Sequence, residues 1–195
     1  LEHGEARTAL TAQRYANGVV TGVDGAVIES FELDPWPRWM LALPGGVRVT
    51  HERFARHGLP LVVLRWSLQG APAGTRLAVR PLLSGRDMHA LHHHNDAFRF
   101  SAEDAEGAIG WHPYDGVTGV LALADAEYEH APDWYWRFSY TAERDRGLDC
   151  EEDLASPGVF RWDLTRGEAV LLLGADIAEV RTLLTRGTAR QLEQK

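Results

Sequence analysis

The fold is indicated first by the stretch Gly46-Val-Arg-Val-Thr-His-Glu-Arg53, in which apolar and polar residues alternate. This alternation has the period of a half-buried β-strand. The next run, Leu59-Pro-Leu-Val-Val-Leu-Arg-Trp66, is a nearly continuous apolar segment of strand length, and the turn cluster Gly70-Ala-Pro-Ala-Gly74 follows it. The two runs therefore predict two strands with a turn after the second.

Short runs of the same kind recur along the rest of the chain. Apolar residues alternate with polar ones, or cluster over strand lengths, in residues 75–82, 97–100, 117–123 and 159–164. Many short strands at this spacing favour antiparallel pairing over βαβ units. The sequence thus predicts an all-β fold, a large antiparallel β-sandwich, over residues 1–175.

One helix is predicted near the C-terminus, in residues 176–195. Asp176 is expected to cap it, with Glu179 three residues later. Gly187 is expected to end it, and a polar tail follows. Four apolar side chains fall on one face of this helix: Ile177, Val180, Leu183 and Leu184. The segment is interpreted as a helix and linker toward another domain, or alternatively as a terminal helix packed on the sandwich.

Composition excludes several classes of function. The 195 residues carry a formal charge of -8, which disfavours binding to nucleic acid, and 45% of them are hydrophobic, enough for a sizeable core. A single cysteine, Cys150, fits a reducing compartment, so we expect a cytoplasmic protein. The sequence has no run of membrane-spanning length, no signal-peptide character and no initial Met. We therefore expect no membrane partner, and a piece of a longer or processed chain.

The most informative polar segment is residues 140–160, entered from the aromatic run Trp134-Tyr-Trp-Arg-Phe-Ser-Tyr140. It is interpreted as a loop that Pro157 and Gly158 close. Charges of both signs beside aromatic rings suit sugar recognition, because carboxylates and guanidinium groups bond hydroxyls and rings cover pyranose faces. The alternative is a solvated loop with surface ion pairs. The charged residues are Glu143, Arg144, Asp145, Arg146, Asp149, Glu151, Glu152 and Asp153.

In the aromatic run itself, strand alternation predicts that Trp134, Trp136, Phe138 and Tyr140 share one face, which is most simply a core face. Trp134, at the start of the run, and the polar side around Tyr135 and Arg137 are then the expected ligand-facing groups.

A second constellation runs from Arg86 to Asp96 and contains three consecutive histidines, residues 92–94. Zinc is one reading, with His89 or Asp96 completing the ligand set. However, the spacing matches no standard zinc pattern, and consecutive residues of an extended chain point in different directions. We therefore expect no metal here, and Arg86 with Asp87 is interpreted as a polar anchor at a strand end.

A third constellation is Phe31-Glu-Leu-Asp-Pro-Trp-Pro-Arg-Trp39. Its two prolines force extended backbone and exclude a central strand. Trp36 and Trp39 are expected to plug a sheet edge or to cover a groove.

Catalytic motifs are scarce. The sequence has neither a Gly-x-Ser-x-Gly elbow nor a phosphate-binding glycine loop. Glycoside hydrolysis needs two carboxylates on opposite sides of a bond, and Glu143, Asp149, Glu152 and Asp153 are the residues able to supply them.

The order of several motifs resembles the N-terminal domain of prokaryotic glycogen debranching enzymes of the amylo-α-1,6-glucosidase type. The similarity runs from about Leu10 to about Ala175, and the glycine-rich opening segment with an Arg-Tyr-His-Gly-like strand is missing before it. The matching segments are Tyr15-Ala-Asn-Gly-Val-Val20, residues 29–39, Val63-Leu-Arg-Trp66, Arg80-Pro-Leu82, Arg86-Asp-Met-His89, Asn95-Asp96, residues 143–149 and residues 152–158.

The resemblance implies a β-sandwich that precedes a catalytic α/α barrel, which hydrolyses α-1,6 branch linkages in glycogen. The general acid and base would belong to that barrel, so this chain is expected to have no catalytic residues, cofactor or metal. Its expected partners are the barrel and an α-glucan, glycogen or a maltooligosaccharide. The alternatives are a stand-alone carbohydrate-active enzyme that uses carboxylates of residues 143–153 and a purely structural docking domain.

The residues expected to lie near a ligand or an interface act through hydroxyl hydrogen bonds from charged groups and stacking from the indole. For each of them, the simpler role is an ion pair that braces a loop. They are Arg86, Asp87, His89, Trp134, Glu143, Arg146, Asp149 and Asp153.

Overall fold

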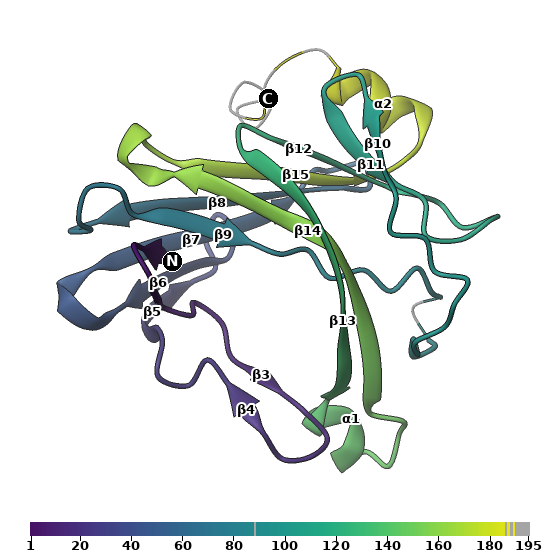
Figure 1. Cartoon of the computed structure of the whole chain (residues 1–195), viewed down its shortest axis with the longest axis horizontal. Helices are drawn as coiled ribbons and strands as arrows, with labels where there is room; N and C mark the ends of the chain where they lie inside the picture. Colours follow the sequence, from purple (N-terminus) through teal and green to yellow (C-terminus); the bar gives the residue numbers. More distant parts are fainter. Residues whose placement is uncertain (88, 186, 188, 190–195) are drawn as a thin grey trace.

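The computed structural model describes residues 1–87, 89–185, 187 and 189. Two stacked antiparallel sheets and a separate hairpin make up the fold (Figure 1). The predicted mainly β, antiparallel fold is confirmed. The strands are β1 Glu2–His3, β2 Ala6–Arg7, β3 Gln13–Arg14, β4 Val20–Thr21, β5 Val27–Glu32, β6 Arg38–Ala42, β7 Arg48–Ala55, β8 Leu61–Gln69, β9 Arg76–Val79, β10 Ala102–Ala105, β11 Ala108–Trp111, β12 Val120–Ala124, β13 Glu127–Ser139, β14 Glu151–Asp163 and β15 Ala169–Ala175.

The larger sheet has eight strands in the order β10-β11-β12-β15-β8-β7-β6-β5, and the smaller has five in the order β13-β14-β9-β1-β2. Strands β3 and β4 form the hairpin. The helical elements are α1 Thr141–Asp145, α2 Ala178–Leu184 and the short 3₁₀ turns Pro44–Gly46 and Leu164–Arg166. None of the described helices is long and apolar enough to cross a membrane.

Consecutive residues of β15 are buried. Since consecutive strand residues point to opposite sides of a sheet, both faces of the larger sheet are buried along this strand. Leu171 belongs to the core between the sheets, with Trp66, Trp111 and Phe160. Leu172 belongs to a second core on the outer face. A run of apolar residues therefore replaces alternation in this strand.

Helix α2 covers the outer core, where Val180 and Leu184 are buried. The predicted apolar face is confirmed, since Ile177 and Leu183 also pack there. The predicted cap is wrong: Ile177 is the N-cap residue and makes no side-chain capping bond. Asp176 instead accepts hydrogen bonds from Arg181, Nε at 3.0 Å and Nη2 at 2.6 Å, and its Oδ2 lies 2.7 Å from the His112 Nε2.

The helix also ends earlier than Gly187 predicts, at Leu184 with Thr185 as the C-cap residue. Most of the predicted polar tail, residues 188 and 190–195, lies outside the described residues.

Two predictions about local structure are wrong. Residues 97–100 form no strand. Phe98 is buried instead by rings, with centroids 5.5 Å from Tyr114 and 5.2 Å from Trp134. In this segment, side-chain packing takes the place of a hydrogen-bonded ladder.

Pro157 and Gly158 lie inside β14 and do not close a loop. They are accommodated because the register of β13 shifts between His130 and Asp133, directly opposite them. A proline has no N–H to give to a ladder, and a bulge in the partner strand is a position where this costs little. A Cβ on Gly158 would lie 2.3 Å from the Glu129 carbonyl oxygen, so the close approach of the strands requires glycine.

The β13–β14 hairpin is long and curved. We call its part beyond β9, residues 130–139 and 151–158, the arm; Figure 1 shows α1 at its end and the β3–β4 hairpin beside that end. The backbone contacts agree, since the Ala16 N–H donates to the Arg137 carbonyl at 2.9 Å and Tyr15 forms an isolated bridge with Phe138. The arm thus carries the polar segment away from the core.

Candidate functional site

The predicted division of the aromatic run into two faces is wrong. Trp134 and Trp136 lie on one side of the arm, with ring centroids 4.8 and 4.6 Å from His94. Phe138 lies on the other side, 5.1 Å from Tyr15 and 6.4 Å from Tyr135. Alternation fails because the register shifts between Tyr135 and Phe138.

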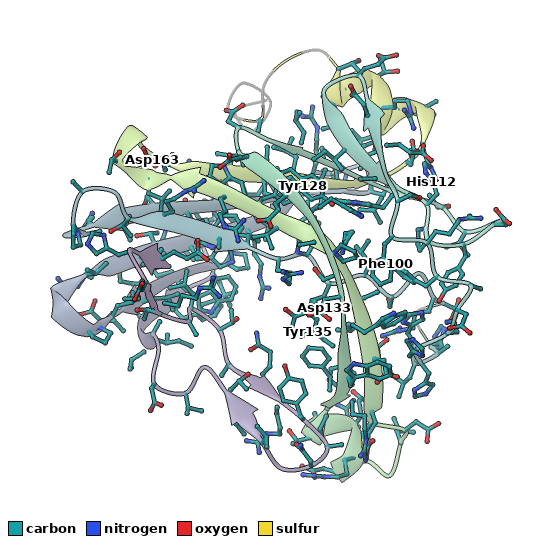
Figure 2. The ribbon with its side chains drawn as sticks, viewed as in Figure 1. Phe100, His112, Tyr128, Asp133, Tyr135 and Asp163 are labelled. Carbon is teal, nitrogen blue, oxygen red and sulfur yellow. The ribbon has the colours of Figure 1, made fainter. Side chains whose placement is uncertain are left out.

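Arg137, inside this shift, has a φ of 55°. Such a bulge re-aims the side chains that follow it. Figure 2 shows the two sides of the arm, with Tyr135 toward the β3–β4 hairpin and Phe100 on the opposite side.

A groove of about 1310 Å³ lies at the end of the arm. It brings together four of the eight predicted site residues: Arg86, His89, Glu143 and Asp149. Three parts of the chain that are far apart in the sequence line it: residues 12–14, then Arg86 with residues 89–91 and His93, and lastly residues 138–143 with Leu148, Asp149 and Leu154. Gln13, Arg14, Phe138, Tyr140 and Leu148 also line it and were not predicted as ligand-near.

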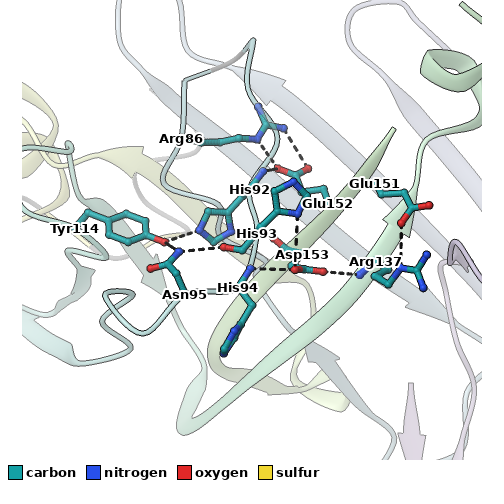
Figure 3. Close-up of polar contacts among 10 residues, drawn as sticks. All are labelled: Arg86, His92, His93, His94, Asn95, Tyr114, Arg137, Glu151, Glu152 and Asp153. Atoms are coloured by element: carbon teal, nitrogen blue, oxygen red, sulfur yellow. Dashed lines mark hydrogen bonds and ion pairs between the residues drawn. The ribbon is translucent and has the colours of Figure 1, made fainter. Parts of the chain in front are cut away.

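Arg86 is fixed in this wall by Glu152 of β14 (Figure 3). Its Nε donates to Glu152 Oε1, and its Nη2 donates to Oε2 at 3.2 Å. The same carboxylate accepts the Tyr140 hydroxyl at 2.5 Å and the His92 N–H at 3.1 Å. A bidentate guanidinium pair with two further donors holds the arginine in one orientation.

Glu152 is only 1% exposed, yet it stays ionised. Burial by itself raises its pKa, but the hydrogen bonds from Arg86, Tyr140 and the His92 N–H outweigh burial and hold the pKa below its usual value. For Tyr140, burial and the adjacent carboxylate both raise the pKa of the phenol. The pair therefore consists of a neutral phenol donating to a charged carboxylate.

Asp153 is 8% exposed, and its carboxylate accepts hydrogen bonds from backbone N–H groups. It accepts the Arg137 N–H at 2.7 Å and the His94 N–H at 2.9 Å. A backbone bond also joins the histidine segment to β14, because the Asp153 N–H donates to the His92 carbonyl at 2.8 Å. Figure 3 shows these bonds joining the histidine segment to the arm.

The remaining predicted residues lie at the margin of the groove or on the other side of the arm. Trp134 stacks on His92, with centroids 5.5 Å apart, opposite the groove side. Asp87 accepts the His89 N–H at 2.8 Å. Arg146 pairs with Glu143 at 3.5 Å, and both side chains are accessible to solvent.

The three histidines point in different directions. His92 contacts the Tyr114 hydroxyl through Nε2 at 2.6 Å, His93 lines the groove, and His94 contacts the two tryptophans. Within the described part of the chain, no group of three or more His, Cys, Asp or Glu side chains is arranged to hold a metal ion.

The groove offers hydrogen-bond donors from guanidinium groups, acceptors from carboxylates, and apolar surface from Leu148 and Phe138. This combination can bond hydroxyl groups and cover C–H faces of a neutral, hydroxyl-rich ligand. The sequence pointed to Glu143 and Asp149 through the crowding of charges around them, and to Arg86 and His89 through the polar constellation of residues 86–96. It gave no signal for residues 12–14, which reach the groove only through the packing of the β3–β4 hairpin on β13.

Two stacked antiparallel sheets with a polar groove on a projecting arm define a β-sandwich domain whose candidate site lies outside the core. The family model described as glycogen debranching enzyme N terminal matches residues 1–171. The chain belongs to this family, so the resemblance seen in the sequence is confirmed, and the match extends it to residues 1–9. Membership implies association with the rest of a debranching enzyme. No curated protein matches the chain.

Proposed function

We propose that this chain is a non-catalytic β-sandwich domain that packs on the catalytic α/α barrel of a glycogen-debranching glycoside hydrolase and contacts α-glucan in the groove. In this proposal, cleavage of the α-1,6 bond belongs to the barrel, in the cytoplasm. Residues 1–175 form the sandwich, and residues 176–195 lead from it toward the barrel. The family match supports the first part, and the groove supports the second.

The proposal of glucan contact is supported mainly by the fixed orientation of the Arg86 guanidinium group. Within the described contacts, three of its five N–H groups bond to Glu152 and to the Asp87 carbonyl. In this proposal the other two N–H groups donate to a ligand in the groove. Because the guanidinium is already held in place, a hydroxyl that binds it meets little additional entropic cost.

Glu143 and Asp149 act as acceptors in this proposal, and His89 and Arg146 add polar contacts at the margin. Leu148 covers an apolar sugar face. Asp87 positions His89, while Asp153 and Trp134 hold the arm and the histidine segment in shape and affect the ligand through them.

Calorimetry with maltooligosaccharides at millimolar concentration tests glucan contact. We expect measurable heat for the unaltered chain. Asp149→Asn and Glu143→Gln are each expected to weaken binding by roughly three- to tenfold, the cost of one hydrogen bond. Asp145→Asn is the matched control, because Asp145 is exposed on α1 but does not line the groove.

Absence of heat, together with no shift in melting temperature at millimolar sugar, would refute glucan contact and leave a docking domain. Turnover of branched oligosaccharides by this chain alone, abolished by Glu143→Gln or Asp153→Asn, would instead establish a stand-alone enzyme.

A further inference from the structure

A second concavity, of about 520 Å³, lies next to the groove on the side of the arm that faces the β3–β4 hairpin. We call it the inner hollow. Its lining comes from residues within 1–13, from Trp66 of β8, from residues 77–80 with Leu82, and from Tyr135 and Phe138 of β13. Tyr135 was expected from the sequence to face a ligand. It does line a concavity, although not the groove at the end of the arm.

The inner hollow and the groove adjoin along the arm, because they share two lining residues, Gln13 and Phe138. Phe138 is buried, so little of its ring projects between them. The Gln13 amide is bonded to Thr11 at 2.9 Å and to Thr21 at 3.1 Å, and among the described contacts its side chain makes no hydrogen bond to the arm. The boundary between the two concavities is therefore not closed by a bonded pair of side chains.

The two concavities together are longer than one sugar ring. Tyr140 lines the groove and Tyr135 lines the inner hollow, on the same extended segment. Five residues of a β-strand span roughly 16 Å. A ligand that contacts both tyrosines must therefore consist of several units joined in a line.

Arg80 is the polar anchor of the inner hollow. Its Nη1 donates to the Ala131 carbonyl at 2.8 Å and to the Ser156 hydroxyl at 3.1 Å, which fixes the guanidinium against the arm. Its guanidinium carbon lies 5.9 Å from the centroid of the Tyr135 ring. Among the described residues, no carboxylate forms an ion pair with this arginine. A half-buried guanidinium of this kind is a donor for oxygen atoms of a ligand.

The inner hollow has the chemistry of a sugar subsite. The Tyr135 ring can cover the apolar face of a pyranose while Arg80 donates to its hydroxyl groups. The other charged residues of the lining, Glu2 and Arg7, lie 3.6 Å apart as an ion pair. The groove likewise combines charges of both signs. Since neither concavity accumulates one sign of charge, a neutral, hydroxyl-rich chain fits them better than a phosphate group.

We propose that the inner hollow is a second subsite of the glucan site, which thereby takes a linear α-glucan chain of several units. Tyr135 stacks on one sugar of the chain, and Arg80 donates to its hydroxyls through Nε and Nη2. This inference rests on the glucan contact of the proposed function and adds the length of the ligand and the two residues that select it. A chain that reaches both concavities gains contacts that a short one lacks, so its affinity is higher.

Calorimetry of this chain with maltotriose and with maltoheptaose tests the inference. Tyr135→Ala is expected to weaken maltoheptaose binding by roughly five- to tenfold and to change maltotriose binding by less than about twofold. Tyr135→Phe keeps the ring and is expected to retain most of the affinity. Trp136→Ala is the matched control, because Trp136 is the next residue, is 51% exposed and lies on the opposite side of the arm.

Hydrogen exchange of the unaltered chain gives a second measurement that does not depend on how a variant folds. Maltoheptaose is expected to slow exchange in residues 7–11, which line the inner hollow but not the groove, and maltotriose is expected to leave them unchanged. Binding of maltotriose without protection of residues 7–11 by maltoheptaose, or an equal effect of Tyr135→Ala on both sugars, would overturn the second subsite and leave glucan contact in the groove intact. Absence of binding by either sugar would overturn both proposals.

Discussion

Two glutamates of this domain, Glu52 and Glu152, are buried to a similar extent and bond to arginines, yet they hold different kinds of backbone. Glu52, on β7, accepts hydrogen bonds from Arg38 at 2.8 Å, from Arg65 at 2.7 Å and from the Trp36 indole at 3.1 Å. Arg38 and Arg65 lie on the neighbouring strands, directly opposite it in register. The Glu52 cluster therefore reinforces strands that a hydrogen-bonded ladder already joins.

Glu152 bonds instead to Arg86 and His92, in the segment between β9 and β10, whose described residues form no regular strand or helix. Here isolated backbone bonds join the segment to β14, at Leu83–Ala155 and at His92–Asp153, and the carboxylate adds side-chain bonds to them. The same kind of carboxylate–arginine cluster therefore reinforces paired strands at Glu52, whereas at Glu152 it helps to set the path of an irregular segment. The groove wall belongs to the second kind.

The largest expected effect is that of Glu152→Gln. Removing the charge leaves Arg86, Tyr140 and the His92 N–H without an ionised acceptor, so we expect the free energy of unfolding to fall by about 3–5 kcal/mol. Chemical denaturation measures this, and hydrogen exchange is expected to accelerate in residues 83–95.

The matched control for this prediction is Glu151→Gln, one residue away, where an exposed pair with Arg137 contributes at most about 1 kcal/mol. A loss of less than 1 kcal/mol for Glu152→Gln would contradict the role assigned to this carboxylate.

Glu52→Gln sharpens the comparison. Its two arginine side chains retain 39% and 31% exposure, so they can turn toward water when the carboxylate is lost. We expect a cost of about 2 kcal/mol in the same denaturation experiment, with faster exchange confined to β6, β7 and β8. If this substitution costs as much as Glu152→Gln, the distinction between the two sites is wrong.

Acid provides a third test. Burial raises the pKa of each glutamate, but the hydrogen bonds outweigh it, so both folded-state pKa values lie below the usual one. Stability from these groups is therefore complete above the unfolded-state pKa of about 4.3 and is lost as the pH falls toward the folded-state values. Denaturation measured from pH 7 to pH 3 is expected to show this loss. The double variant Glu52→Gln with Glu152→Gln is expected to show a flatter dependence of the free energy of unfolding on pH. An unchanged slope would refute the assignment of the acid loss to these two glutamates.

The smallest effect concerns His51, whose ring is stacked between those of Trp39 and Trp66. Burial lowers the pKa of its imidazole, against the hydrogen bond to the Arg65 carbonyl. A depressed histidine pKa contributes stability that is complete above about 6.5 and is lost as the pH falls below that value. His51→Phe keeps a ring between Trp39 and Trp66 and is expected to remove up to about 1 kcal/mol of stability change between pH 7 and pH 5.5. Unfolding curves at the two pH values compare the variant with the unaltered chain, and identical differences would exclude this titration.

Much of the fold was predictable from periodicity. Residues 46–53 and 59–66 predicted strands that the structure places at β7 and β8, within two or three residues. Periodicity did not identify β15, because a strand buried on both faces loses its alternation. It misread residues 97–100, where rings bury the segment without a ladder, and residues 151–158, where Pro157 lies opposite a bulge of the partner strand.

The candidate site was predictable only in part. The crowding of charges pointed to the end of the arm, and Arg86, His89, Glu143 and Asp149 do meet in one groove. The sequence did not separate the exposed carboxylates of α1 and its turn from Glu152 and Asp153, which β14 buries. Burial depends on which segment packs over a strand, and here His92 and His94 contact Glu152 and Asp153 from about sixty positions earlier in the chain.

The sequence by itself determined the class of fold, the family and the composition of the polar segment, because strand periodicity, turn residues and motif order are local properties. Only the tertiary structure decided which charges face solvent, where the groove lies, and which strands form the edges of the sheets. Each of these depends on contacts between segments distant in the sequence, and those contacts set burial, and with it the energy of every charge and ring.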